Sequence, residues 1–421
     1  MPLTELIPLI VLVAMFVIAT RWPLNIGVMG LVASFFVGYF VLDMDDKEIL
    51  EEFPTSIVMT IIGVTYFFSM AQRNGTIDLI VQRCIQGVRG RVALMPWIFF
   101  LLASVLTALG TFSPAAVALL APAGMAFAHR SRISPVAIGA LIINGAHAGG
   151  FSPISVAGVL VRDIASKNHY DISATKLFFA SYAINLIVSV ITVVAMAALG
   201  RFRDRGAERT DEADLHDEGH TGRVTRQQWL TLALIVGIII CALILKLPIS
   251  FVSLTAGLIL AFTNIKEHKS FINGVSWSTV LLVGGMVTYV SLLVHAGVIE
   301  TLADAAVHLG SPLLVALVLC YVIGVASAFA SSTALLTAFI PLAVPLLQSS
   351  GLSPIGVIAA LAISATIVDV SPFSTDGALV VANARGDHTK TIYNRLMGYA
   401  GLVVIGGPLL AWALLVVLHL V

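Results

Sequence analysis

Charge is what this sequence has least of. Only 11% of its 421 residues are Asp, Glu, Lys or Arg, whereas 58% are hydrophobic, and the mean hydropathy is +1.00. A chain of this composition cannot bury its apolar surface in one water-soluble core, which excludes an ordinary soluble domain. Apolar runs of about 17–25 residues, the length that spans a bilayer, recur along the whole sequence. The composition therefore indicates an α-helical polytopic membrane protein.

Cysteine and the signatures of cofactor binding are also scarce. The three cysteines stand far apart, without metal-ligand spacing, and we interpret them as small buried hydrophobes: Cys84, Cys241 and Cys320. The glycine-rich stretch 145–150 lacks the pattern of a phosphate-binding loop and is interpreted as a site of close helix packing. We expect no organic cofactor and no nucleic-acid partner. The opening residues have no basic region and no cleavage site follows, so the first apolar run is expected to be a retained helix.

A polar tract at 201–228, rich in Arg, Asp, Glu and His, reads as a solvated linker between two hydrophobic halves, 1–200 and 229–421. In the first half we expect spans at 4–20, 24–42, 55–73 and 175–199, an interfacial segment at 75–88, and two broken runs, 92–128 and 135–168. In the second we expect spans at 229–246, 248–265, 277–295 and 391–420, an interfacial piece at 297–309, and broken runs 312–348 and 354–384.

The two halves share residues at a constant offset. Adding 219 to a position in the first half takes Ser152-Pro153 to Ser371-Pro372, and it pairs other polar and small residues in the same way: Ser113 with Ser332, Ser155 with Ser374, and Gly158 with Gly377. One such match in an apolar background could be chance. Several at one offset predict an internal repeat.

The broken runs 92–128 and 312–348 are predicted to be re-entrant hairpins, which leaves five crossings in each half. An odd number of crossings makes the repeats inverted. With the linker in the cytoplasm, 18 of the 23 Lys and Arg residues fall on the inner side, as the positive-inside rule requires. We therefore predict an inner-membrane protein with both termini outside.

The two Ser-Pro breaks are the candidate binding site. Ser is a favoured N-cap and Pro a favoured first helical residue, so Ser152-Pro153 and Ser371-Pro372 are predicted to start half-helices within the membrane. The second hairpin arms would start at Ser113-Pro114 and Ser332-Thr333. Four helix N-termini, each with about half a positive charge, suit an anion with two negative groups. The alternative is that these four breaks are ordinary helix kinks or caps without a role in binding.

Unwound backbone and a few ionisable side chains flank the breaks. Carbonyls near Gly150, Phe151, Asp369 and Val370 could hold a hard cation such as sodium, the only inorganic ligand we expect. Asp369 could be a cation ligand, a proton carrier or a structural carboxylate. Asp376 could merely stabilise a helix N-terminus. His147 could titrate during transport or be hydrogen-bonded packing.

The motifs resemble those of a known family. The paired hairpins and Ser-Pro breaks are similar to the ion-transporter superfamily, in its divalent-anion symporter branch. Gly-Gly-Phe-Ser-Pro-Ile-Ser at 149–155 and Asp-Val-Ser-Pro-Phe-Ser-Thr-Asp-Gly at 369–377 are most similar to malonate-carrier-type dicarboxylate permeases. The resemblance covers nearly all of the chain outside the linker. It implies a homodimer with a static scaffold and an elevator-like transport domain.

The same resemblance implies a set of site residues. In carboxylate symporters each hairpin tip carries Ser-Asn-Thr, which binds a substrate carboxylate and sodium. Here the tips are Thr111-Phe112-Ser113 and Ser331-Ser332-Thr333, so Asn is absent from both. The implied sodium positions at the tips are Thr111 and Ser331. The implied substrate contacts are Ser113, Ser152, Pro153, Ser155, Ser332, Thr333, Ser371, Pro372 and Ser374.

The sequence thus predicts a secondary transporter of a small dicarboxylate, coupled to sodium or protons, that works by alternating access and is not an enzyme. One alternative is another carrier of the superfamily, such as a cation/proton antiporter or a monocarboxylate permease. A different class would be a membrane-embedded hydrolase using His147, Ser152 and Asp369. The offset places Thr366 and Gly150 opposite His147 and Asp369, so the repeat favours a symmetric binding site over this catalytic set.

Overall fold

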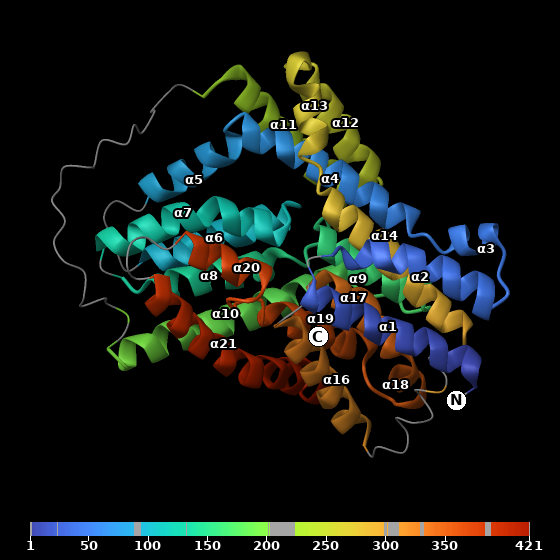
Figure 1. Cartoon of the computed structure of the whole chain (residues 1–421). Helices are drawn as coiled ribbons and strands as arrows, with labels where there is room; N and C mark the ends of the chain where they lie inside the picture. Colours follow the sequence, from blue (N-terminus) through green and yellow to red (C-terminus); the bar gives the residue numbers. More distant parts are fainter. Residues whose placement is uncertain are drawn as a thin grey trace.

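The computed structural model describes residues 2–22, 24–87, 94–131, 133–200, 202, 224–298, 301, 311–328, 332–383 and 389–420, and in these parts its regular elements are helices (Figure 1). In the first half they are α1 (Leu3–Arg21), α2 (Ile26–Val41), α3 (Asp46–Glu51), α4 (Thr55–Arg73), α5 (Thr76–Gly87), α6 (Met95–Ala108), α7 (Ser113–Ser131), α8 (Pro135–Gly149), α9 (Val156–Lys167) and α10 (Ala174–Ala198).

The second half contains α11 (Arg226–Leu243), α12 (Ile249–Ala261), a 3-10 turn at Ile265–Glu267, α13 (His268–Asn273), α14 (Trp277–His295), α16 (Pro312–Ser327), α17 (Ser332–Leu342), α18 (Val344–Ser349), α19 (Pro354–Ile367), α20 (Thr375–Ala382) and α21 (Thr389–Trp412), which continues as a π-helix, Ala413–Val417. Most of the linker and of the interfacial piece at 297–309 lie outside the described residues.

Each long apolar run forms helix where the sequence predicts it, and both 55–73 and 277–295 agree with α4 and α14. Two short helices were not predicted. One is α3, which is held by a capping box: the Asp45 carboxylate accepts from the Glu48 amide at 2.8 Å, and Glu48 accepts from the Asp45 amide at 2.9 Å. The other is α13, which lies beyond a 118° bend that follows α12. The predicted span 248–265 therefore ends early, at Ala261.

Four helices in the described part of the chain are long and apolar enough to cross a membrane: α4, α10, α14 and 392–417. The bent pair 249–261 and 265–273 could make a fifth, and most of the remaining apolar helices have 10–17 residues. Such short apolar helices are the expected product of long runs broken by Gly, Ser and Pro. The number of crossings therefore stays a prediction.

Small residues bring α2 and α14 into close contact. A Cβ atom built on Gly285 would lie 1.7 Å from the carbonyl oxygen of Gly27, and one on Gly30 would lie 2.7 Å from that of Gly285. The two backbones therefore touch, which lets the helices pack closely without large side chains between them.

The second helix of each predicted hairpin, α7 or α17, packs on an interrupted helix of the other half. α7 lies against α20, and α17 lies against α9, so each hairpin arm of one half contacts the helix fragment of the other (Figure 1). α8 completes the group by packing on α6, α7 and α10. This arrangement brings all four chain breaks into one buried region.

Candidate functional site at the meeting of four chain breaks

The two Ser-Pro sequences form tight turns between helices rather than helix starts. The Ser155 amide donates to the Ser152 carbonyl at 3.1 Å, and the Ser374 amide donates to the Ser371 carbonyl at 2.9 Å. Proline sits second in each turn, where its fixed φ is also favoured. The predicted caps are therefore wrong by three residues: α9 begins at Val156 and α20 at Thr375.

Ser155 and Ser374 are the actual caps. Their hydroxyls accept from the Gly158 amide at 3.2 Å and the Gly377 amide at 3.4 Å. The same hydroxyls donate back to the carbonyls of Gly150 and Asp369, both at 2.5 Å. The carbonyls at two predicted cation positions, Gly150 and Asp369, thus already accept one hydrogen bond. Each carbonyl oxygen has a second lone pair that could bind a cation. Their role as cation ligands therefore stays a prediction.

The two turns leave no room for a side chain at the third residue of the following helix. A Cβ atom on Gly158 would lie 2.2 Å from the Ser152 carbonyl oxygen, and one on Gly377 would lie 2.0 Å from that of Ser371. The helix backbone therefore presses directly on the turn, and only glycine fits there.

At the first hairpin tip, Gly110 has φ of +116°, a conformation that lets the chain reverse between α6 and α7. Ser113 is the first residue of α7, as predicted, but its hydroxyl donates to the carboxylate of Asp376 rather than capping its own helix. Thr111 and Phe112 line a cavity of about 60 Å³ next to α4.

At the second tip, Ser332 begins α17 and lies next to Asp369. Thr333 follows in the first turn and is buried. Ser331 lies outside the described residues. Each hairpin thus places one serine beside a carboxylate of the second interrupted helix: Ser113 beside Asp376 and Ser332 beside Asp369.

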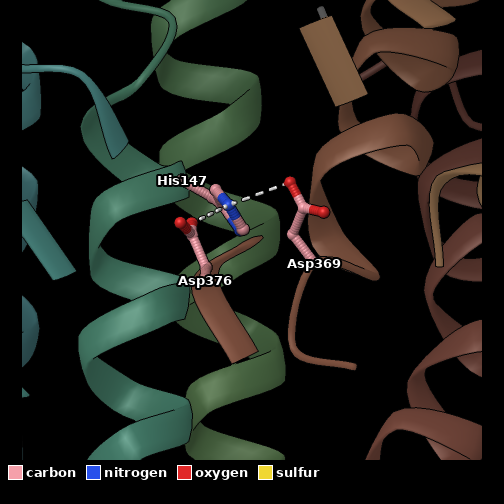
Figure 2. A group of neighbouring side chains, drawn as sticks. All are labelled: His147, Asp369 and Asp376. Carbon is pink, nitrogen blue, oxygen red and sulfur yellow. Dashed lines mark hydrogen bonds and ion pairs between the residues drawn. The ribbon is translucent and has the colours of Figure 1, made fainter. Parts of the chain in front are cut away.

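His147, Asp369 and Asp376 form a buried cluster between the two interrupted helices (Figure 2). The Nε2 atom of His147 lies 3.1 Å from a carboxylate oxygen of Asp376 and 3.9 Å from one of Asp369. The exposed fraction is 3% for His147, 7% for Asp369 and 1% for Asp376. The atoms are close enough together for a cation, but because imidazole and Asp376 already share a hydrogen bond, we interpret the cluster as hydrogen-bonded.

Glycines in α8 set the position of His147. Cβ atoms on Gly145 and Gly149 would lie 2.2 Å and 2.0 Å from carbonyl oxygens of α6. α8 therefore rests directly on the α6 backbone, and Ser181 of α10 donates to the His147 carbonyl at 3.0 Å. The glycine-rich stretch serves close packing, which agrees with the interpretation from the sequence.

The cluster has unused hydrogen-bonding capacity. Among the residues that the structure describes, His147 Nδ1 and one carboxylate oxygen of Asp376 are buried and have no hydrogen-bond partner. A buried polar atom without a partner costs about 1–3 kcal/mol, so its presence suggests a role other than stability. Asp376 also lies in the first turn of α20, where the helix dipole favours a negative charge.

The hydrolytic arrangement is not assembled. The Ser152 hydroxyl donates to the Ala108 carbonyl at 2.5 Å, whereas His147 faces Asp376. A catalytic serine would have to donate to the imidazole. Ser152 instead ties the first turn to the end of α6, which joins the first hairpin to this region.

Comparison with known proteins gives a matching sequence family and a solved structure with a similar fold. Residues 1–150 match the sequence family described as the N-terminus of the dicarboxylate carrier protein MatC. Over residues 1–150, this match confirms the resemblance to malonate-carrier-type dicarboxylate permeases. The matched MatC region covers the chain from α1 through α8 and includes His147. A search of curated proteins gives no match.

A solved transporter shares the fold. The crystal structure of the YdaH transporter of Alcanivorax borkumensis, described as having an unusual topology, superposes with a TM-score of 0.61. The match covers 87% of this chain and 86% of that one, at 14% identity. Together with the apolar helices, this supports a multi-pass membrane protein whose fold is similar to that of YdaH.

Proposed function

We propose that the protein is a cation-coupled secondary transporter of a small dicarboxylate. The observation that carries the proposal is the meeting of four chain breaks around buried hydroxyls and carboxylates, in a chain whose N-terminal part matches a dicarboxylate carrier family. The helices α7, α9, α17 and α20 all begin at this region, and helix N-termini favour anions.

Alternating access through inverted repeats is the proposed mode of transport. It is supported by the reciprocal packing of α7 on α20 and of α17 on α9. It is also supported by the equal hydrogen bonds at the two breaks, from Ser155 to Gly150 and from Ser374 to Asp369. In this proposal the hairpins and interrupted helices move as an elevator-like domain against a scaffold.

The remaining parts of the proposal concern placement and assembly. The positive-inside count supports an inner-membrane location with the linker in the cytoplasm and both termini outside. We also propose a homodimer, as the family resemblance implies. The substrate contacts are the turn residues Ser152, Pro153, Ser371 and Pro372 together with Ser113, Ser332 and Thr333; Ser155 and Ser374 hold the turns in shape.

Purified protein in liposomes should accumulate labelled malonate or succinate when an inward sodium or proton gradient is imposed. Lactate tests the monocarboxylate alternative, and an excess of unlabelled malonate tests saturability. Failure to take up any dicarboxylate under either gradient would contradict the proposed function. Uptake of lactate alone would favour the monocarboxylate permease.

Substitution of the two serines of the second turn should separate stability from substrate binding. Ser374→Ala removes a helix cap and is expected to lower the free energy of unfolding by about 0.5–2 kcal/mol. Ser371→Ala removes an acceptor for the Phe373 amide at 3.3 Å but no helix cap, so it should change stability less and malonate affinity more. Thermal unfolding and malonate titration measure the two effects. Unchanged affinity in Ser371→Ala would argue against this turn as a substrate contact.

A further inference from the structure

We propose that a groove between α10 and α21 binds an anionic phospholipid of the inner leaflet, with its headgroup at Arg395 and an acyl chain along the groove. The groove has a volume of about 870 Å³ and lies between two helices that contact each other (Figure 1). It is a different place from the buried cluster, because none of His147, Asp369 and Asp376 lines it. The proposal therefore concerns a contact with the membrane and not the transport site.

One face of each helix lines the groove. The lining residues follow one another at intervals of three or four, which places them on a single helix face. On α10 this face consists of Val188, Ile191, Thr192, Ala195, Met196 and Leu199, and on α21 it includes Gly398, Leu402, Gly406 and Leu410. The exposed fraction is 56% for Ile191, 66% for Leu199 and 71% for Leu402. The groove is therefore apolar and open at the surface, where a membrane protein meets lipid.

Two glycines of α21 keep the groove unfilled. A Cβ atom on Gly398 or Gly406 would meet nothing within 4 Å. By contrast, a Cβ atom on Gly407 would lie 2.8 Å from the Cγ2 atom of Ile367, so this glycine allows close packing on α19. Gly398 and Gly406 thus face free space rather than a neighbouring helix, and this space can take an acyl chain.

The groove has one polar end and a length that suits one leaflet. Asn394 and Arg395 line it near the start of α21, which the positive-inside rule places on the cytoplasmic side. From Arg395 to Gly407 the helix rises about 18 Å, at about 1.5 Å per residue. One leaflet contributes about 15 Å of hydrocarbon. The polar end and the apolar length therefore match the headgroup and the acyl chain of a lipid in the inner leaflet.

Charge selects an anionic lipid as the occupant. Arg395 is the only charged residue among the described lining residues, and no carboxylate in the described part of the chain pairs with it. A guanidinium can bind a phosphate through two hydrogen bonds, and basic pockets between helices on the cytoplasmic side bind lipid headgroups.

A second copy of the chain fits the groove less well. A two-fold dimer brings the same surface of both partners together, so Arg395 would face a groove that offers it no carboxylate. A dicarboxylate ion fits less well too, because it would leave the apolar length of the groove empty. An anionic phospholipid matches both the charge and the apolar length.

The test is lipid binding by the full-length protein in detergent, after its native lipid has been removed. Phosphatidylglycerol and phosphatidylcholine with the same acyl chains are titrated, and bound lipid is measured by native mass spectrometry. We expect phosphatidylglycerol to bind more tightly. Arg395→Gln should weaken its binding about fivefold, the effect of one cationic side chain near a membrane surface, and should leave phosphatidylcholine unchanged. Gly406→Leu fills the groove and should weaken the binding of both lipids.

Two matched controls separate this site from the rest of the membrane surface. Arg226→Gln removes an exposed arginine of α11 outside the groove, and Gly401→Leu adds the same side chain to α21 at an open position that does not line it. Both should bind the two lipids as the wild type does.

Three results would overturn the proposal. One is equal affinity of the wild type for the two lipids, which needs no variant to fold. Another is unchanged phosphatidylglycerol binding in Gly406→Leu. The third is a change of dimer mass in Gly406→Leu at every lipid concentration, which would assign the groove to a second copy. None of these results depends on whether the protein transports a dicarboxylate, so the proposed function is tested separately by uptake.

Discussion

Alanine at Gly377 is expected to reduce dicarboxylate transport by about tenfold or more, because the added methyl group has no place to go. Its Cβ atom would lie 2.0 Å from the carbonyl oxygen of Ser371 and 2.9 Å from that of Val370. Both obstacles are backbone, so the turn at 371–374 must open, which displaces Ser371 and the neighbouring Asp369. Overpacking of this kind costs about 1–3 kcal/mol. Initial rates of malonate uptake at equal protein density measure the effect.

Two further variants make the Gly377 result specific. Gly158→Ala places a Cβ atom 2.2 Å from the Ser152 carbonyl oxygen and should impair uptake similarly, because the first turn has the same construction. Gly401→Ala on α21 meets nothing within 4 Å and should transport normally. Normal uptake by Gly377→Ala would show that the shape of this turn does not matter for transport.

Alanine at Gly285 is expected to have the largest effect on stability. The Cβ atom would lie 1.7 Å from the Gly27 carbonyl oxygen, so α2 and α14 would have to separate along their contact. We expect a loss of about 1–3 kcal/mol or more, seen as a lower thermal unfolding temperature in detergent. Gly237→Ala on α11, where nothing lies within 4 Å, is the control and should unfold like the wild type. Equal unfolding temperatures for the two variants would contradict the close packing of α2 on α14.

The helices could be predicted from the sequence because apolar runs and their breaks are local signals. The positions of α4 and α14 follow directly from such runs. Local signals were less reliable at the breaks. A Ser-Pro pair can be a helix N-cap followed by the first helical residue, or the first two residues of a β-turn, because proline has the same φ in both. The second serine, three residues later, decides between them by capping the next helix.

The cluster could not be predicted in the same way, because His147 and Asp376 are 229 residues apart. From the sequence, hydrogen-bonded packing was the favoured interpretation of His147, and stabilisation of its own helix that of Asp376. Only the packing of α8 and α7 against α20 brings them together. The available signal was that an ionisable residue inside an apolar run must find a partner, and the sequence does not say which one.

The central claim is that a dicarboxylate binds where the four chain breaks meet, and a structure determined with malonate bound tests it most directly. We predict density for malonate between the turns at 152–155 and 371–374, in contact with Ser371 and within reach of Ser113 and Ser332. The account would be contradicted if malonate instead occupied another cavity, such as the groove of about 870 Å³ between α10 and α21 that contains Arg395.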